Sequence, residues 1–180
     1  IRASRKLWVP ATLFLPKASS QPFPAMVVAH GIGGLYTRDG ARRAYWNYAA
    51  DLAANGVAAL LVDTHGARGL GVLGQETQVA VSLYTFIADA FAAADMLRTH
   101  PAIDPERIGL MGFSKGGNTT LAAADVRFAT ALSEDSNRFK LHIAIYPGCQ
   151  VFPEAPQLSG FPIRMLLGGS DNYTGIKGCY

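Results

Sequence analysis

Five short apolar runs, most of them separated by helix-like segments, restrict the folds open to this chain. The runs are "AMVVAHG", "VAALLVDTHG", "RIGLMGFS", "LHIAIYPG" and "FPIRMLLGGSD". Strands that are apolar on both faces are typical of parallel sheets covered by helices on both sides. The pattern therefore predicts an α/β fold with buried strands. An earlier stretch, "KLWVPATLFLPK", is predicted to be a strand or hairpin arm broken by Pro10.

Three helices are predicted between these strands. The first, "ARRAYWNYAADLAANG", ends at Asn55-Gly56, the second runs from about Glu76 to Arg98, and the third starts at "KGGNTTLAAADV". Right-handed crossovers place the carboxyl ends of parallel strands along one edge of the sheet, where ligands bind in such folds. We find no repeat or linker, so we expect a single domain over residues 1–180.

Composition and charge exclude several classes of protein. Hydrophobic residues make up 49% of the 180 residues and charged residues 16%, which predicts a folded core. The net charge of +3 is scattered rather than gathered into a basic stripe, so we expect no nucleic-acid partner. No apolar run approaches the roughly 18 residues of a membrane span. Two cysteines are too few for a four-cysteine zinc site, and we expect no metal.

The stretch "GLMGFSKGGN" carries the strongest sign of chemistry. Ser114 lies between Gly112 and Gly116 where a predicted strand meets a predicted helix. This is the G-x-S-x-G turn that lifts a nucleophilic serine above the edge of a sheet, and the glycines avoid collisions of side chains with neighbouring backbone. The alternative is an ordinary strand–helix turn with a capping serine.

An activated serine also needs an oxyanion hole, and two segments can supply it. One amide would come from Lys115, directly after the serine. The other would come from the loop "AHGIGG", where Ile32 is the first choice and Gly33 the second. We interpret His30 as a structural residue that holds this loop.

The acid that orients the base is predicted at Asp171, in "MLLGGSDNYT" after the last apolar run. A plain turn aspartate is the alternative.

Taken together, these segments resemble the α/β-hydrolase superfamily, and within it the dienelactone hydrolase-like family. The resemblance rests on His30-Gly31-Ile32-Gly33-Gly34, "DTHGARG", "DPERIGLMGFSKGG" and "LLGGSDNYT", and covers nearly the whole chain. It implies an α/β-hydrolase fold, hydrolysis of esters or lactones through an acyl-enzyme, and no cofactor. Because position 114 is serine where the dienelactone hydrolases proper use cysteine, the resemblance points to a serine-nucleophile branch.

The resemblance also implies a catalytic histidine after the acid, and none follows Asp171 before Tyr180. We therefore expect a truncated sequence, in which the last strand, histidine loop and closing helix lie beyond Tyr180. His65 is a weaker candidate for the base and a better one for a pocket wall or an anchor of the loop. His100 and His142 are expected away from the active edge.

Other residues near the predicted strand ends are candidates for binding or structure. Cys149 and Cys179 are expected to form a disulfide, which would suit a periplasmic or secreted protein; separate thiols would suit the cytoplasm. Arg68 is a candidate contact for an anionic substrate, with surface exposure as the alternative. Tyr146 and Tyr173 are expected to line the pocket or its rim.

The function predicted from the sequence is a serine hydrolase of small carboxylic esters or lactones. The alternative is a non-catalytic binding protein of the same fold that lacks the base. The sequence indicates neither the substrate's acyl and alcohol groups nor the oligomeric state.

Overall fold

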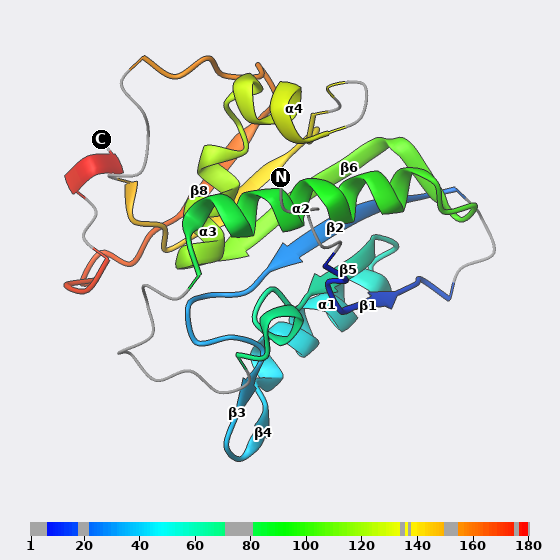
Figure 1. Ribbon diagram of the computed structural model, residues 1–180, viewed down its shortest axis with the longest axis horizontal. Helices are drawn as coiled ribbons and strands as arrows, with labels where there is room; N and C mark the ends of the chain where they lie inside the picture. The colour runs from blue at the N-terminus through cyan, green and yellow to red at the C-terminus, as the bar shows by residue number, and fades with distance from the viewer. Residues whose placement is uncertain are drawn as a thin grey trace, which may run out of the picture.

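Six strands form one sheet in the computed structural model, which describes residues 7–17, 22–70, 81–133, 136, 138–149, 155–174 and 177–179. In spatial order they are β1 (Ala11–Phe14), β5 (Ala58–Val62), β2 (Phe23–Ala29), β6 (Ile103–Phe113), β7 (His142–Ile145) and β8 (Ile163–Leu166). Only the β1–β5 pair among them is antiparallel. A small hairpin of β3 (Tyr36–Thr37) and β4 (Gly40–Ala41) projects below the sheet (Figure 1).

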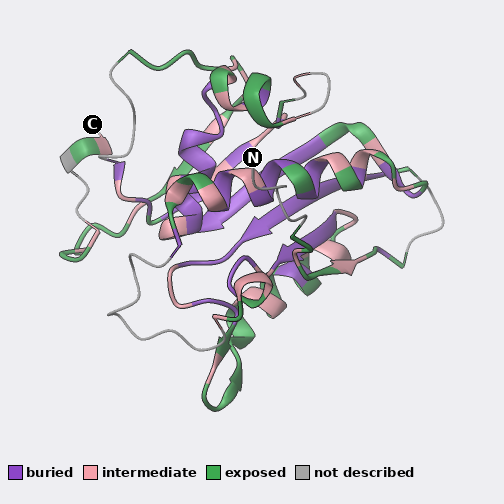
Figure 2. Cartoon of the chain, in the orientation of Figure 1, coloured by how far each residue is buried: buried purple, intermediate pink, exposed green. Residues whose placement is uncertain are grey.

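Helices cover both faces of this sheet (Figure 1). Helices α2 (Leu83–Arg98) and α3 (Lys115–Ala122) pack on one face, and α1 (Arg43–Ala54) packs on the other. Strand β2 shows the alternation behind this arrangement, because Val27 joins the α2 side of the core and Val28 the α1 side. Figure 2 shows the central strands buried between these layers. The predicted mostly parallel α/β sheet is therefore confirmed.

The helices differ from the prediction in two ways: α2 has a different first residue, and a further helix is present. Helix α2 begins at Leu83, because the Ser82 hydroxyl accepts a hydrogen bond from the Thr85 amide at 3.2 Å and caps the helix. The predicted start at Glu76 falls in residues 71–80, which lie outside the described residues. Helix α4 (Val126–Leu132) was not predicted, although Asp125 caps it by accepting from the Arg127 amide at 3.0 Å.

Two strands also differ. Strand β6 begins at Ile103 rather than near Arg107, and its register against β2 shifts between Phe23 and Ala25, which accommodates Pro105. Strand β8 was predicted to be buried and is not. It pairs with β7 alone among the described strands, and Met165 and Leu166 are 42% and 52% exposed. No helix in the described part of the chain is long and apolar enough to cross a membrane.

Candidate active site

A pocket of about 270 Å³ opens at the carboxyl edge of the sheet, where the strand order predicts a ligand site. Its walls come from the loop after β2, the start of α2, the β6–α3 turn, the loop after β7 and the loop after β8. The lining residues are Ile32, Leu83, Ser114, Lys115, Asn118, Gly148, Tyr173 and Thr174. Three residues predicted for catalysis, Ile32, Ser114 and Lys115, thus line one pocket.

Ser114 stands in a strained backbone conformation, with φ 51° and ψ −112°. A non-glycine residue at such a φ persists only where the surroundings enforce it. Here the Ser114 amide donates to the Ile145 carbonyl at 2.9 Å, which joins the turn to the end of β7. Its hydroxyl makes no hydrogen bond to any described residue. The turn therefore holds a free hydroxyl at the pocket.

The flanking glycines are required by close backbone contacts. A Cβ at Gly112 would overlap the carbonyl of Gly116, and a Cβ at Gly116 would overlap the carbonyl of Ala29. Helix α3 thus approaches β6 and β2 more closely than any side chain would permit. This closeness fixes the direction in which Ser114 leaves the sheet.

The loop after β2 runs alongside this turn. A Cβ at Gly31 would lie 3.5 Å from Cβ of Ser114, and the Gly31 amide donates to the Tyr45 hydroxyl at 3.1 Å. The Gly34 amide donates to the Gly31 carbonyl at 3.1 Å, which closes a tight turn around Ile32 and Gly33. The Ile32 amide has no hydrogen-bond partner among the described residues, so it can donate to a ligand.

His30 and His65 lie buried behind this loop. Their rings meet edge to face at 4.7 Å, and both pack on Phe86. Burial lowers the pKa of each imidazole to about 4. The His30 Nδ1 lies 2.6 Å from the Gly31 carbonyl oxygen, which agrees with the predicted structural role of His30. His65 is 1% exposed and does not line the pocket, so of the two predicted places, pocket wall or loop anchor, the structure gives it the second, behind the loop.

Lys115 spans the mouth of the pocket toward α2. Its Nζ donates to the Val81 carbonyl and lies 5.4 Å above the Phe86 ring. Burial lowers the pKa of this ammonium group. The side chain thus fastens the start of α3 to the residues before α2, while its backbone stands at the first position of α3.

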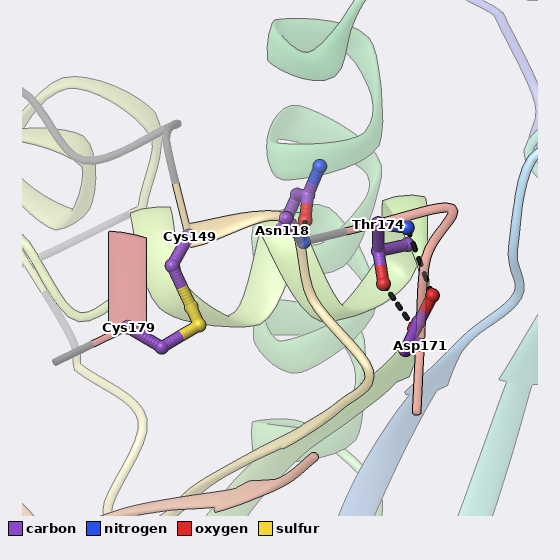
Figure 3. Close-up of a disulfide and its surroundings, with 6 residues drawn as sticks. Asn118, Cys149, Asp171, Thr174 and Cys179 are labelled. Atoms are coloured by element: carbon purple, nitrogen blue, oxygen red, sulfur yellow. Dashed lines mark hydrogen bonds between the residues drawn. A yellow bond between two sulfur atoms is a disulfide. The ribbon is translucent and has the colours of Figure 1, made fainter. Parts of the chain in front are cut away.

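Asp171 lies in the loop after β8 and is held by its own turn. Its carboxylate accepts from the Tyr173 amide at 2.9 Å. It also accepts from the Thr174 amide at 3.0 Å and from the Thr174 hydroxyl (Figure 3). The hydroxyl bond of Thr174 and these amide bonds lower the pKa of Asp171. Tyr173 and Thr174 line the pocket and Asp171 does not. The acid is therefore ionised at the rim, next to the pocket wall.

A disulfide joins Cys149 to Cys179, with the two Cα atoms 5.1 Å apart (Figure 3). Next to Cys149, the Gly148 amide donates to the Asn118 side-chain oxygen at 2.6 Å. One wall of the pocket is thus tied both to α3 and to the chain that follows Asp171.

Three further residues that were predicted to contact the substrate lie outside the lining of the pocket that contains Ser114. Arg68 turns away from the pocket: it binds Asp89 of α2 through two hydrogen bonds of 2.9 and 3.0 Å and donates to the Thr64 carbonyl. The structure therefore gives it an internal ion pair in place of the predicted substrate contact. Gly33 lies under the Arg42 guanidinium, and Tyr146 faces a second pocket beside Phe113.

Asn118, Thr174 and Leu83 line the pocket and were not predicted. Asn118 stands four residues after Ser114 on α3, so helical spacing could have placed it on the same side. Leu83 and Thr174 carry no such signal, because they reach the site only when α2 packs on the sheet and the loop after β8 folds over it. Among the described residues, no cluster of histidine, cysteine and carboxylate side chains could hold a metal ion.

A mostly parallel sheet with a strained serine at a strand–helix turn defines the α/β-hydrolase fold, and solved structures agree. Esterase 2 of Thermogutta terrifontis superposes with a TM-score of 0.70 over 95% of this chain and 70% of its own, at 18% identity. Est1E from Butyrivibrio proteoclasticus superposes with a TM-score of 0.57 over 77% of this chain and 49% of its own, at 22% identity. Residues 44–147 match the prolyl oligopeptidase family, and the chain belongs to that family.

Two relatives of known description are more similar in sequence. A probable 2-oxo-3-(5-oxofuran-2-ylidene)propanoate lactonase from a Bradyrhizobium species is 32% identical over 56% of this chain and 40% of its own length. Thiohydrolase aneE from Aspergillus aculeatus is 34% identical over 62% of this chain and 32% of its own length. The chain thus spans less than half the length of both relatives.

Proposed function

We propose that this protein is a serine hydrolase of small carboxylic esters or lactones. The observation that carries the proposal is Ser114, whose free hydroxyl enters the pocket from a strained turn. The chain is similar to a lactonase, a thiohydrolase and esterases, and these names all describe cleavage of acyl bonds. The similarity supports this class of reaction. Beside its membership of the prolyl oligopeptidase family, we propose that the chain shares the chemistry of the serine branch of the dienelactone hydrolase-like enzymes.

In the proposed reaction, the Ser114 oxygen attacks the carbonyl carbon and the carbonyl oxygen becomes negative. The amides of Lys115 and Ile32 stabilise that charge. The alcohol leaves with a proton, and water then releases the acid from the acyl-serine. The pocket's position at the start of α3 adds the positive end of the helix dipole.

The base that serves Ser114 is proposed to be a histidine oriented by Asp171 and distinct from the four histidines of this chain. The histidines of this chain are placed for other roles. His142 begins β7, at the edge of the sheet opposite the pocket, and His100 follows the end of α2. His30 and His65 are buried behind the loop and have pKa values of about 4.

The test is covalent labelling of the full-length protein with a fluorophosphonate, followed by peptide mapping. We expect one adduct, at Ser114. Ser114→Ala should lose both the adduct and ester hydrolysis, by a factor of about 10³ or more. Ser170→Ala is the matched control, since Ser170 is an exposed serine beside Asp171. Rapid hydrolysis by Ser114→Ala would refute the proposal, and a folded wild type without an adduct would favour a binding protein.

A further inference from the structure

A second pocket, of about 460 Å³, lies beside the serine turn on the α1 side of the sheet. None of its lining residues was given a role in the cleavage step proposed above. It is lined by two arginines, three tyrosines, one phenylalanine and one alanine: Arg42, Arg43, Ala44, Tyr45, Tyr48, Phe113 and Tyr146. We call it the tyrosine–arginine pocket.

This pocket is continuous with the serine turn. Phe113 lines it and immediately precedes Ser114. Tyr45 lines it too, and its hydroxyl accepts a hydrogen bond from Gly31, the glycine that packs against Ser114. The pocket is therefore connected to the serine in two ways, through Phe113 alone and through Tyr45 and Gly31.

Aromatic rings that pack against one another line much of the pocket. The Phe113 ring is 2% exposed, and its centre lies 5.1 Å from that of Tyr45, 5.0 Å from that of Tyr48 and 6.1 Å from that of Tyr146. Tyr146 is held there at φ 38°, a conformation rare for tyrosine. Burial, together with the nearby hydroxyls of Tyr45 and Tyr48, raises the pKa of Tyr146, so this phenol is a neutral hydrogen-bond donor.

The charge of the pocket is positive and unbalanced. Four other arginines, Arg68, Arg98, Arg107 and Arg127, each bind an aspartate. Arg42 and Arg43 have no carboxylate partner among the described residues, and no acidic residue lines the pocket. Arg42 is anchored by donating from Nε to the Gly33 carbonyl at 3.3 Å, which leaves its terminal nitrogens available.

We propose that the tyrosine–arginine pocket binds the aromatic carboxylate end of the ester that Ser114 cleaves. Planar rings fit between the tyrosines, and guanidinium and phenol groups are the donors that a carboxylate prefers. The proposal rests on the proposed function for the cleavage step only, because binding of the acid alone needs no activated serine. After cleavage, the same pocket would hold the product that carries the aromatic carboxylate.

The test is calorimetric binding of benzoate and of its neutral isostere benzamide to full-length Ser114→Ala. We expect benzoate to bind at least about tenfold more tightly than benzamide, and less tightly as salt is added. Arg43→Gln should weaken benzoate about five- to tenfold and leave benzamide within about twofold. Arg164→Gln, an exposed arginine on β8, should change neither affinity.

Equal affinities for benzoate and benzamide, or an unchanged benzoate affinity in a folded Arg43→Gln, would overturn the proposal. Tyr48→Phe gives a second check, because it removes one phenol donor and keeps the ring that packs on Phe113. Since these measurements use a protein without the serine hydroxyl, their failure is independent of the fluorophosphonate result. Turnover of 4-acetoxybenzoate against 4-acetoxybenzamide by the wild type then links binding to cleavage.

Discussion

Ser114 joins the chemistry of the site to a cost in stability. Its φ of 51° is a region that side chains avoid, and such strain costs of order 1–3 kcal/mol. Glycine would adopt the same backbone freely but would remove the hydroxyl. At this position glycine would therefore give the more stable protein, whereas serine supplies the hydroxyl that the proposed reaction needs.

Replacing Ser114 by glycine should therefore give a more stable protein than replacing it by alanine. We expect a difference of about 1 kcal/mol in the free energy of unfolding, because relief of strain exceeds the extra entropy of glycine in the unfolded chain. Urea titration of the two variants measures it. At Ser170, whose φ is not positive, the alanine variant should instead be more stable than the glycine variant. An alanine variant as stable as the glycine variant would show that position 114 is unstrained.

How far the sequence predicts the site depends on whether a residue lies in a local motif. Ser114 and Lys115 follow from strand, turn and helix in one segment, and Ile32 from a glycine-rich loop after a strand. The partner of Arg68 does not follow, because Asp89 lies 21 residues away and meets it only when α2 packs beside the turn. Tyr45 and Tyr48 look like ordinary helix residues until α1 is docked against Phe113.

At the scale of elements, the contact between α3 and the sheet holds the serine turn in place. Gly116 of α3 lies against the backbone of Ala29 and His30 at the end of β2. No rotamer change can relieve a collision with backbone, so the helix itself would have to move.

Gly116→Ala should consequently destabilise the protein by about 3 kcal/mol, the upper end of the usual cost of overpacking. Thermal or urea unfolding measures the loss. Gly169→Ala is the matched control, because a Cβ there meets nothing within 4 Å and its φ is not positive; it should change stability by less than about 1 kcal/mol. Equal effects at the two positions would contradict the close approach of α3.

The disulfide is a second link between elements, since it connects the loop after β7 to the loop after β8. It joins residues 30 apart in the sequence. Closing a loop of that length should stabilise the folded chain by about 3 kcal/mol. We expect Cys149→Ala combined with Cys179→Ala to lose that amount in urea titrations without reductant.

Reduction of the disulfide with dithiothreitol supplies the control for this comparison of the wild type with the double variant. In the presence of dithiothreitol, the wild type should fall to the stability of the double variant, whose own transition should not move. A wild type that is no more stable than the double variant without reductant would mean that the bridge contributes nothing.

The elements themselves were predictable where their patterns were strong. The apolar runs of β2, β5, β6 and β7 gave the parallel sheet. The missed features depend on neighbours: α4 is only seven residues long, and the burial of β8 is decided by what lies beside it in the sheet. A run of apolar letters cannot distinguish a central strand from one at the edge.

For the whole molecule, the buried histidines determine the response to acid. His30 and His142 are both 0% exposed, on opposite sides of the fold, and burial lowers the pKa of each to about 4 from 6.5. Below the unfolded pKa of 6.5, the unfolded chain therefore binds protons that the folded chain refuses. The folded state is therefore at its full stability with respect to these two histidines above pH 6.5, and it loses stability as the pH falls toward 4.

Each of these two histidines should cost about 2 kcal/mol between about pH 7 and pH 5. Urea titrations across that range measure the fall in the free energy of unfolding. His142→Gln removes one titrating group distant from the pocket. Between about pH 7 and pH 5, the free energy of unfolding of this variant should therefore fall less than that of the wild type, by the contribution of one histidine. This comparison holds whatever the stability of the variant at neutral pH. A variant that parallels the wild type at every pH would mean that His142 takes up its proton in the folded state. The acid sensitivity would then belong to other groups.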